Sequence, residues 1–168
     1  TGGTISGVSR VLREKSPQTK IILSEPDNAS LIGSKLKQDR NADNTPASSH
    51  SSWNPHLIQG WTPDFIPFVL QETIDNNYFD QLIPVSGEQG IVWAKRLARA
   101  EGIITGISGG STFAVAMEIA KTAPPDSNIL CMLADTGERY LSSPLFEDIP
   151  EEMTEDEQKI SVSTPNYQ

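Results

Sequence analysis

Cysteine, histidine and long apolar runs are all scarce in this sequence. Its 168 residues include one cysteine, Cys131, so no internal disulfide can form and a reducing, cytoplasmic setting is the expectation. No apolar run approaches the ~18 residues that a membrane-spanning helix needs. The two histidines are not spaced with Cys, Asp or Glu as metal ligands are. We therefore expect no membrane partner and no metal site.

Positive charge is scarce as well. Thirteen Lys and Arg residues stand against 22 Asp and Glu residues, for a formal net charge of −9. Seven of the acidic residues lie within 147–157, so the rest of the chain is nearly neutral. Proteins that bind nucleic acid use Lys and Arg to neutralise phosphates. This distribution argues against a nucleic-acid partner.

The apolar share of 36% is low for a compact domain, and two polar segments account for it. Residues 35–55 carry little hydrophobic pattern, and residues 147–168 run from acidic sequence into Ser, Thr, Pro and Asn. Both are typical of mobile surface segments. We expect a domain over 1–147 with a polar surface insert at 35–55, followed by an acidic and polar tail over 148–168.

Helix and strand patterns alternate along the chain. Alternation at this spacing favours an α/β fold with a mostly parallel sheet flanked by helices. Ligands in such folds bind beyond the carboxyl ends of the strands, which makes loops 1–4, 106–111 and 135–139 the informative ones. Hydrophobic periodicity and Gly or Pro boundaries predict helices over 4–15, 87–102 and 112–120, and strands over 20–25, 81–86 and 128–133.

The first loop, Thr1-Gly2-Gly3-Thr4, leads directly into a predicted helix. Two glycines let the backbone approach a ligand, and the free N–H groups of a helix N-terminus favour an anion such as phosphate. The glycine spacing matches neither the dinucleotide fingerprint nor a Walker loop. A tight connection with no ligand is the alternative reading of this pattern.

Residues 106–110, Gly-Ile-Ser-Gly-Gly, fit the G-x-S-x-G pattern of a serine hydrolase. In an α/β-hydrolase the histidine base follows the serine, whereas His50 and His56 both precede Ser108. A serine without a general base is a poor nucleophile, which counts against hydrolysis. Ser108 at a helix end would instead offer a neutral hydrogen bond to a heterocyclic nitrogen, or simply cap the helix.

Four separated segments are distinctive when taken together: TGGTISGV (1–8), HLIQGWTPDFIP (56–67), GISGGSTFAVA (106–116) and DTGERYLSS (135–143). In order and approximate spacing they resemble the cysteine synthase (O-acetylserine sulfhydrylase) family of fold-type-II pyridoxal-phosphate enzymes. The resemblance covers roughly residues 1–147 and matches only the C-terminal half of such an enzyme. It implies that these residues belong to the large cofactor domain.

The resemblance also implies roles for individual residues, with pyridoxal 5'-phosphate as the cofactor. A phosphate cradle, a hydrogen bond to the pyridine nitrogen, contacts near the ring and a substrate contact through a backbone are all expected. Glu138 and Arg139 are expected to form an ion pair that fixes their loop. Thr1, Gly2, Gly3 and Thr4 would form the phosphate cradle, and Ser108 would hydrogen-bond the pyridine nitrogen. Asp135 and Thr136 would lie near the ring, and the Gly60 backbone would contact the substrate.

The implied reaction replaces the acetate of O-acetylserine with sulfide to give L-cysteine. The family carries its Schiff-base lysine in the N-terminal half, and none of the seven lysines here has a matching context. We therefore expect no catalytic residue in this chain, and we expect it to be part of a longer protein, with organellar targeting left open. A homodimer and the C-terminal tail of serine acetyltransferase are the partners implied.

The sequence departs from the family in one loop. Where the family commonly has a glycine-rich GIGAGF, this chain has GWTPDF (60–65), and the insert 35–55 is longer than usual. Trp61 and Pro63 would stiffen and narrow the loop, which puts the substrate in question. Two alternatives stay open: a cystathionine β-synthase-like enzyme with another amino-acid substrate, and a non-catalytic binding module.

Overall fold

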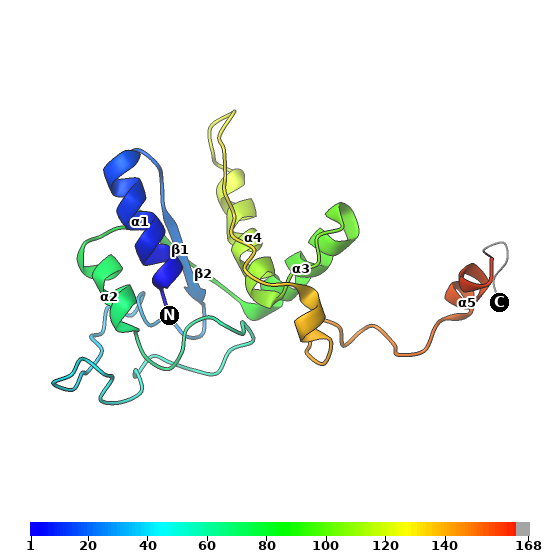
Figure 1. Ribbon diagram of the computed structural model, residues 1–168, viewed down its shortest axis with the longest axis horizontal. Helices are drawn as coiled ribbons and strands as arrows, with labels where there is room; N and C mark the ends of the chain where they lie inside the picture. The colour runs from blue at the N-terminus through cyan, green and yellow to red at the C-terminus, as the bar shows by residue number, and fades with distance from the viewer. Residues whose placement is uncertain (164–168) are drawn as a thin grey trace.

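The computed structural model describes residues 1–163 and shows a small parallel sheet with helices packed around it (Figure 1). Both strands and three of the four longer helices come from segments whose hydrophobic pattern predicted them. The helices and strands are α1 (Gly3–Lys15), β1 (Ile22–Pro26), α2 (Phe68–Asp75), β2 (Gln81–Val85), α3 (Gly87–Glu101), α4 (Ile107–Ala120), the 3-10 turn η1 (Gly137–Tyr140) and α5 (Glu155–Ser161).

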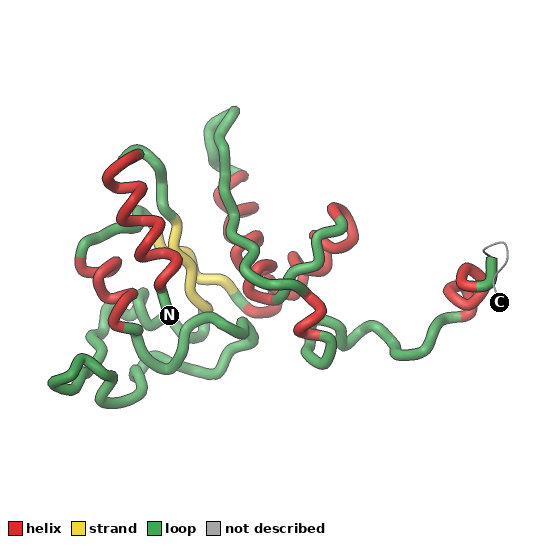
Figure 2. The backbone as a smooth tube through the Cα atoms, viewed as in Figure 1, coloured by secondary structure: helices red, strands yellow, loops and turns green. Residues whose placement is uncertain are grey.

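Strands β1 and β2 run parallel and form the sheet, with Ile22 opposite Gln81 and Pro26 opposite Val85. The prediction of parallel strands here is confirmed. Helix α4 packs on β2 and α3 packs on α4, and the buried core between them includes Val85, Ala94 and Ile107. Figure 2 shows the two strands side by side with helices on both sides.

Helix α3 begins and ends at residues whose chemistry marks a boundary. The Ser86 hydroxyl accepts a hydrogen bond from the Gln89 N–H, and the Gln89 side-chain carbonyl accepts one from the Ser86 N–H, which completes a capping box. Gly102 ends the helix in the left-handed conformation. Because Ser86 directly follows β2, the N-terminus of α3 lies at the carboxyl end of the sheet.

Helix α4 begins at Ile107, so the prediction of a loop over 106–111 is wrong. Its small residues belong to a helical turn, where they allow close packing. A side chain at Gly110 would collide with the Gly90 carbonyl, and one at Gly90 would lie 2.9 Å from the Ile107 carbonyl oxygen. The two glycines let the first turns of α3 and α4 touch.

Helices α1 and α2 form a second unit. Their contact contains a buried hydrogen bond of 2.7 Å between the hydroxyls of Ser6 and Thr73. Asp80, just before β2, accepts the Ile21 N–H at 2.7 Å and pairs with Arg13 at 2.8 Å. These bonds join α1 to the starts of both strands. Helix α2 is not among the elements that the sequence predicted.

Segment 128–133 is not a strand, which makes the prediction for it wrong. Leu130 is 96% exposed, and Ile129 and Met132 are also exposed. Segment 128–133 pairs with neither strand of the described sheet, and the isolated bridge that follows it in the chain joins Thr136 to Thr105. An apolar, β-prone run takes up a strand only when a neighbour satisfies its backbone, and β1 and β2 do not fill that role.

The insert 35–55 contains no helix or regular strand, as expected, but it is not simply a polar surface loop. Gln38 and His50 are buried, and an antiparallel bridge joins Arg40 to Pro46. The tail carries the short helix α5 at the end of an extended arm (Figure 1), and residues 164–168 lie outside the described part. Among residues 1–163, no helix is both long and apolar enough to cross a membrane.

Candidate cofactor site

The N-terminus of α1 has the geometry of an anion site. Gly2 adopts a left-handed conformation with φ +82° and supplies no side-chain cap, and no acidic residue lies in the first turn. The N–H groups of Gly3 and Thr4 therefore begin the helix without an intrahelical acceptor or a capping side chain. Thr1, Gly3 and Thr4 are exposed. These donors and the positive end of the helix dipole suit a phosphate.

Ser108 lies in the first turn of α4 and is 6% exposed. Its neighbours Ser111 and Thr112 donate their hydroxyls to backbone carbonyls four residues back, at 2.9 and 3.0 Å. The Ser108 hydroxyl makes no hydrogen bond to any of residues 1–163. It is therefore a neutral donor and acceptor that remains available to a ligand.

Asp135 is the centre of a small network beside this turn. Its carboxylate accepts the Tyr140 hydroxyl at 2.6 Å and the Thr136 N–H at 2.8 Å. The Tyr140 hydroxyl, followed by the Thr136 N–H, holds the pKa of the Asp135 carboxyl below its usual value. Arg139 pairs with Asp135 at 3.0 Å and forms no ion pair with Glu138 among the described residues, so the predicted Glu138–Arg139 pair is wrong.

The same network reaches the turn before Ser108. The Thr105 hydroxyl donates to the Asp135 carbonyl at 3.0 Å, and the Tyr140 ring packs so closely on Gly106 that any side chain there would collide with it. The structure thus brings Asp135 and Thr136 next to the start of α4. Tyr140 has no place among the residues singled out from the sequence, although it lies within the DTGERYLSS segment.

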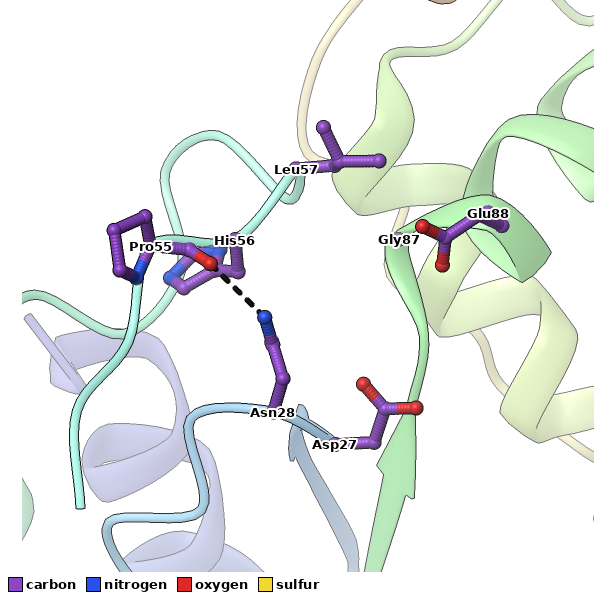
Figure 3. A pocket seen from close by; sticks show the side chains of 7 residues that line it. All are labelled: Asp27, Asn28, Pro55, His56, Leu57, Gly87 and Glu88. Atoms are coloured by element: carbon purple, nitrogen blue, oxygen red, sulfur yellow. Dashed lines mark hydrogen bonds between the residues drawn. The ribbon is translucent and has the colours of Figure 1, made fainter.

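Gly60 lies in an exposed turn with φ +85°. The turn follows the fully buried Ile58, and Trp61 packs partly against the main core. Next to it, the segment 55–57 borders a cleft of about 440 Å³ between the end of β1 and the start of α3 (Figure 3). The residues that line this cleft are Asp27, Asn28, Pro55, His56, Leu57, Gly87 and Glu88.

Contacts join the cleft to the starts of α3 and α4. The Leu57 side chain packs on Gly87 at the start of α3, and Gly90 packs on Ile107 at the start of α4. In Figure 1 the N-termini of α1, α3 and α4 lie toward the end of the sheet to which both strands run. The N-terminus of α1 and the first turns of α3 and α4 therefore lie at the carboxyl ends of the strands, where ligands bind in α/β folds.

The two histidines do not serve Ser108. The Nδ1 atom of His50 accepts the Ser52 N–H at 3.2 Å, so its Nε2–H donates to the Leu36 carbonyl at 3.3 Å. The Nε2 atom of His56 lies 3.0 Å from the Thr62 carbonyl, to which it must donate. With each imidazole bound elsewhere, the described residues provide no base for a serine nucleophile.

The available groups fit pyridoxal phosphate. An uncapped helix N-terminus suits its phosphate, and a neutral hydroxyl suits a pyridine nitrogen that stays largely unprotonated. No group of three or more His, Cys, Asp and Glu side chains within residues 1–163 is arranged to hold a metal ion. The region is therefore a candidate cofactor site that combines anion-binding and neutral polar groups.

Comparison with known sequences agrees with this chemistry. Residues 1–135 match the family described as "Pyridoxal-phosphate dependent enzyme". The chain is 38% identical over 151 residues to O-ureido-L-serine synthase of Streptomyces lavendulae, covering 90% of this chain and 40% of that protein. It is 40% identical over 146 residues to cysteine synthase B of Campylobacter jejuni subsp. jejuni, covering 87% and 42%. The chain thus spans about two fifths of the length of these curated relatives.

Solved structures give the same answer. The crystal structure of O-ureido-L-serine synthase matches with a TM-score of 0.75 and 36% identity, covering 95% of this chain and 44% of that one. Cysteine synthase from Entamoeba histolytica matches with a TM-score of 0.69 and 27% identity, covering 91% and 39%. The expected α/β fold and the expected resemblance are both confirmed. The chain belongs to the pyridoxal-phosphate dependent enzyme family.

Proposed function

We propose that this chain supplies the phosphate and pyridine-nitrogen contacts of an enzyme that forms L-cysteine from O-acetylserine and sulfide. The observation that carries the proposal is a pair of ligand-ready groups. The N–H groups at the start of α1 have no cap, and the buried Ser108 hydroxyl has no partner among residues 1–163. Both sit in the segments that resemble cysteine synthases.

Each part of the site has a defined task in this proposal. Residues 1–4 bind the phosphate through their N–H groups and the Thr hydroxyls, which anchors one end of the cofactor. Ser108 donates a neutral hydrogen bond to the ring nitrogen at the other end. Bound pyridoxal phosphate supplies an electron sink for the substrate's α-carbon, and a neutral nitrogen partner tempers that sink in favour of β-elimination.

The rest of the site would lie in the part of the relatives that this chain does not cover. The Schiff-base lysine, which would also move the α-proton, is expected there. The described chain exposes 11,256 Å², whereas a folded monomer of its mass exposes about 8,100 Å². Part of this excess comes from the extended arm that carries α5 (Figure 1), and the exposed apolar side chains on α1 and α2 support a further segment that covers them.

The direct test uses the full-length natural protein. Purified protein that carries the cofactor should absorb visible light and form L-cysteine from O-acetylserine and sulfide. Ser108→Ala should lower activity by about a hundredfold or more, because the nitrogen contact is lost. Thr112→Ala is the matched control, since its hydroxyl bonds the Ser108 carbonyl and not the ligand. Equal loss in both variants, or no bound cofactor, would contradict the proposal.

A second candidate differs in the nucleophile. The relative from Streptomyces lavendulae is named for a different serine product, so members of this family differ in the nucleophile that they use. An enzyme of the cystathionine β-synthase type would accept a larger thiol. Mass spectrometry of products formed with sulfide and larger nucleophiles in competition separates the two functions.

The oligomeric state, the protein partner and the location rest on the resemblance alone. A homodimer, binding to the C-terminal tail of serine acetyltransferase and a cytoplasmic location stay predictions. Size-exclusion chromatography with light scattering, with and without a peptide of that tail, tests the first two. A monomer at micromolar concentration, or no binding of the peptide, would remove these partners from the proposal.

A further inference from the structure

Two side chains that precede the loop Gly60–Asp64 in the chain donate hydrogen bonds to one backbone oxygen of that loop. The carbonyl of Thr62 accepts the indole Nε1–H of Trp53 at 3.1 Å and the imidazole Nε2–H of His56 at 3.0 Å. We propose that Trp53 and His56 are positioning residues that hold the loop Gly60–Asp64 in a fixed, narrow form and thereby restrict the second substrate to a small nucleophile. The substrate part of this inference rests on the proposed function.

Thr62 would not hold its conformation unaided. Its φ is +32°, in the region that disfavours a β-branched side chain. Such a conformation costs about 1–3 kcal/mol and persists only when surrounding contacts determine it. The two donors on the Thr62 carbonyl are the contacts that do so, because they satisfy both lone pairs of a single oxygen.

The donors themselves are fixed. Trp53 packs partly against the small core cluster of Ala29, Leu31 and Ile66. His56 is held in one tautomer: a carbonyl only accepts, so Nε2 carries the hydrogen, and Nδ1 is buried with no partner among the described residues. His56 also lines the cleft of about 440 Å³ (Figure 3), so it connects the cleft to the loop.

The insert ties down the far end of the same loop. The His50 N–H donates to the Asp64 carbonyl at 2.6 Å, and the Ser49 hydroxyl bonds the Asp64 carboxylate. Gln38 and Arg40 then bind the N–H and carbonyl of Ile66, at 3.0 and 2.6 Å. The segment 38–56 therefore acts as a brace along 62–66, which gives the unusual insert a task.

The consequence for the substrate is steric. Trp61 is packed partly against the main core, and Pro63 has a fixed φ. With Thr62 clamped between them, the loop cannot withdraw to admit a bulkier group. In the proposed enzyme, where the Gly60 backbone contacts the substrate, a loop fixed in this way would discriminate by size, at about tenfold or more for each added methylene.

The two hydrogen bonds from Trp53 and His56 to the Thr62 carbonyl are called the clamp here, and the first experiment measures it without relying on catalysis. In the full-length protein, amide hydrogen exchange over 58–66 should be about fivefold faster in Trp53→Phe and in His56→Leu, since each removes one hydrogen bond. His56→Gln should restore slow exchange, because its amide can place an N–H near the Nε2 position. Asn54→Ala is the matched control, since its side chain bonds the Asn28 carbonyl instead. Unchanged exchange in both Trp53→Phe and His56→Leu would overturn the clamp.

The second experiment measures selectivity. The ratio of kcat/KM for 2-mercaptoethanol to that for sulfide should rise about tenfold in Trp53→Phe and His56→Leu, and should stay at the natural value in His56→Gln and Asn54→Ala. Faster exchange with an unchanged ratio would overturn the selectivity role. A protein without β-replacement activity would contradict both the proposed function and the selectivity role. The exchange data would still test the clamp.

Discussion

Gly2 joins an unusual backbone conformation to the anion site. Its φ is +82°, and an added Cβ would lie 2.6 Å from the Leu70 Cβ atom. We predict that Gly2→Ala lowers the free energy of unfolding by about 2–4 kcal/mol, from the left-handed conformation and the collision together. Gly3→Ala is the control, because nothing lies within 4 Å of its added Cβ. Urea unfolding of the full-length variants measures both, and equal loss would contradict the assignment.

Cys131 is predicted to be a slow nucleophile. Partial burial of the side chain raises the pKa of the Cys131 thiol to about 11. The thiolate is the reactive form, so at pH 8 its fraction is about a hundredfold below that of an ordinary cysteine, and it rises only as the pH approaches 11. Iodoacetamide should therefore label the native protein about a hundredfold more slowly than the urea-unfolded protein. Equal labelling rates would contradict this prediction.

Sequence reasoning at the residue scale identified the groups that are chemically distinctive in a short stretch. Gly2 and Ser108 follow from local spacing, and the structure places both at helix N-termini. Thr62 could not be found this way, because its φ of +32° depends on Trp53 and His56, which only the folded chain brings to its carbonyl. Tyr140 was missed for the same reason: its role comes from contact with Gly106.

At the scale of elements, the crossing of α3 and α4 depends on the absence of side chains at Gly90 and Gly110. An added Cβ at Gly90 would lie 2.9 Å from the Ile107 carbonyl oxygen. We predict that Gly90→Ala separates the helices and lowers the free energy of unfolding by about 1–3 kcal/mol. Gly7→Ala, within α1 and with nothing in 4 Å, should instead stabilise by about 0.5–1 kcal/mol. Thermal unfolding distinguishes the two signs, and destabilisation by both would contradict the packing argument.

Elements were predictable where local sequence alone sets them. Helix α3 has its capping box and terminal glycine, and β1 and β2 have short apolar runs bounded by proline or serine. The start of α4 was misplaced because the glycines of 106–110 resemble a loop, although they serve helix packing. The strand at 128–133 failed because strand formation needs a neighbour, which no local pattern can supply.

At the scale of the whole molecule, apolar surface remains without a cover. The described chain exposes 11,256 Å², against about 8,100 Å² for a folded monomer of its mass. Exposed apolar side chains occur on α1, α2, the 128–133 segment and the tail; they include Val8, Val11, Phe68, Val69, Ile129, Leu130, Met132, Ile149 and Ile160. Patches of this kind mark interfaces or aggregation sites.

These 168 residues produced alone should therefore behave differently from the full-length protein. We predict that the isolated segment binds a hydrophobic dye such as ANS strongly and aggregates at micromolar concentration, because its apolar faces lack their cover. The full-length protein should bind little dye and stay in solution. Added separately, the remainder of the chain should suppress dye binding by the segment. A segment that is monomeric, unfolds cooperatively and binds no dye would mean that these faces are stable in water, and the proposed covering segment would lose its physical support.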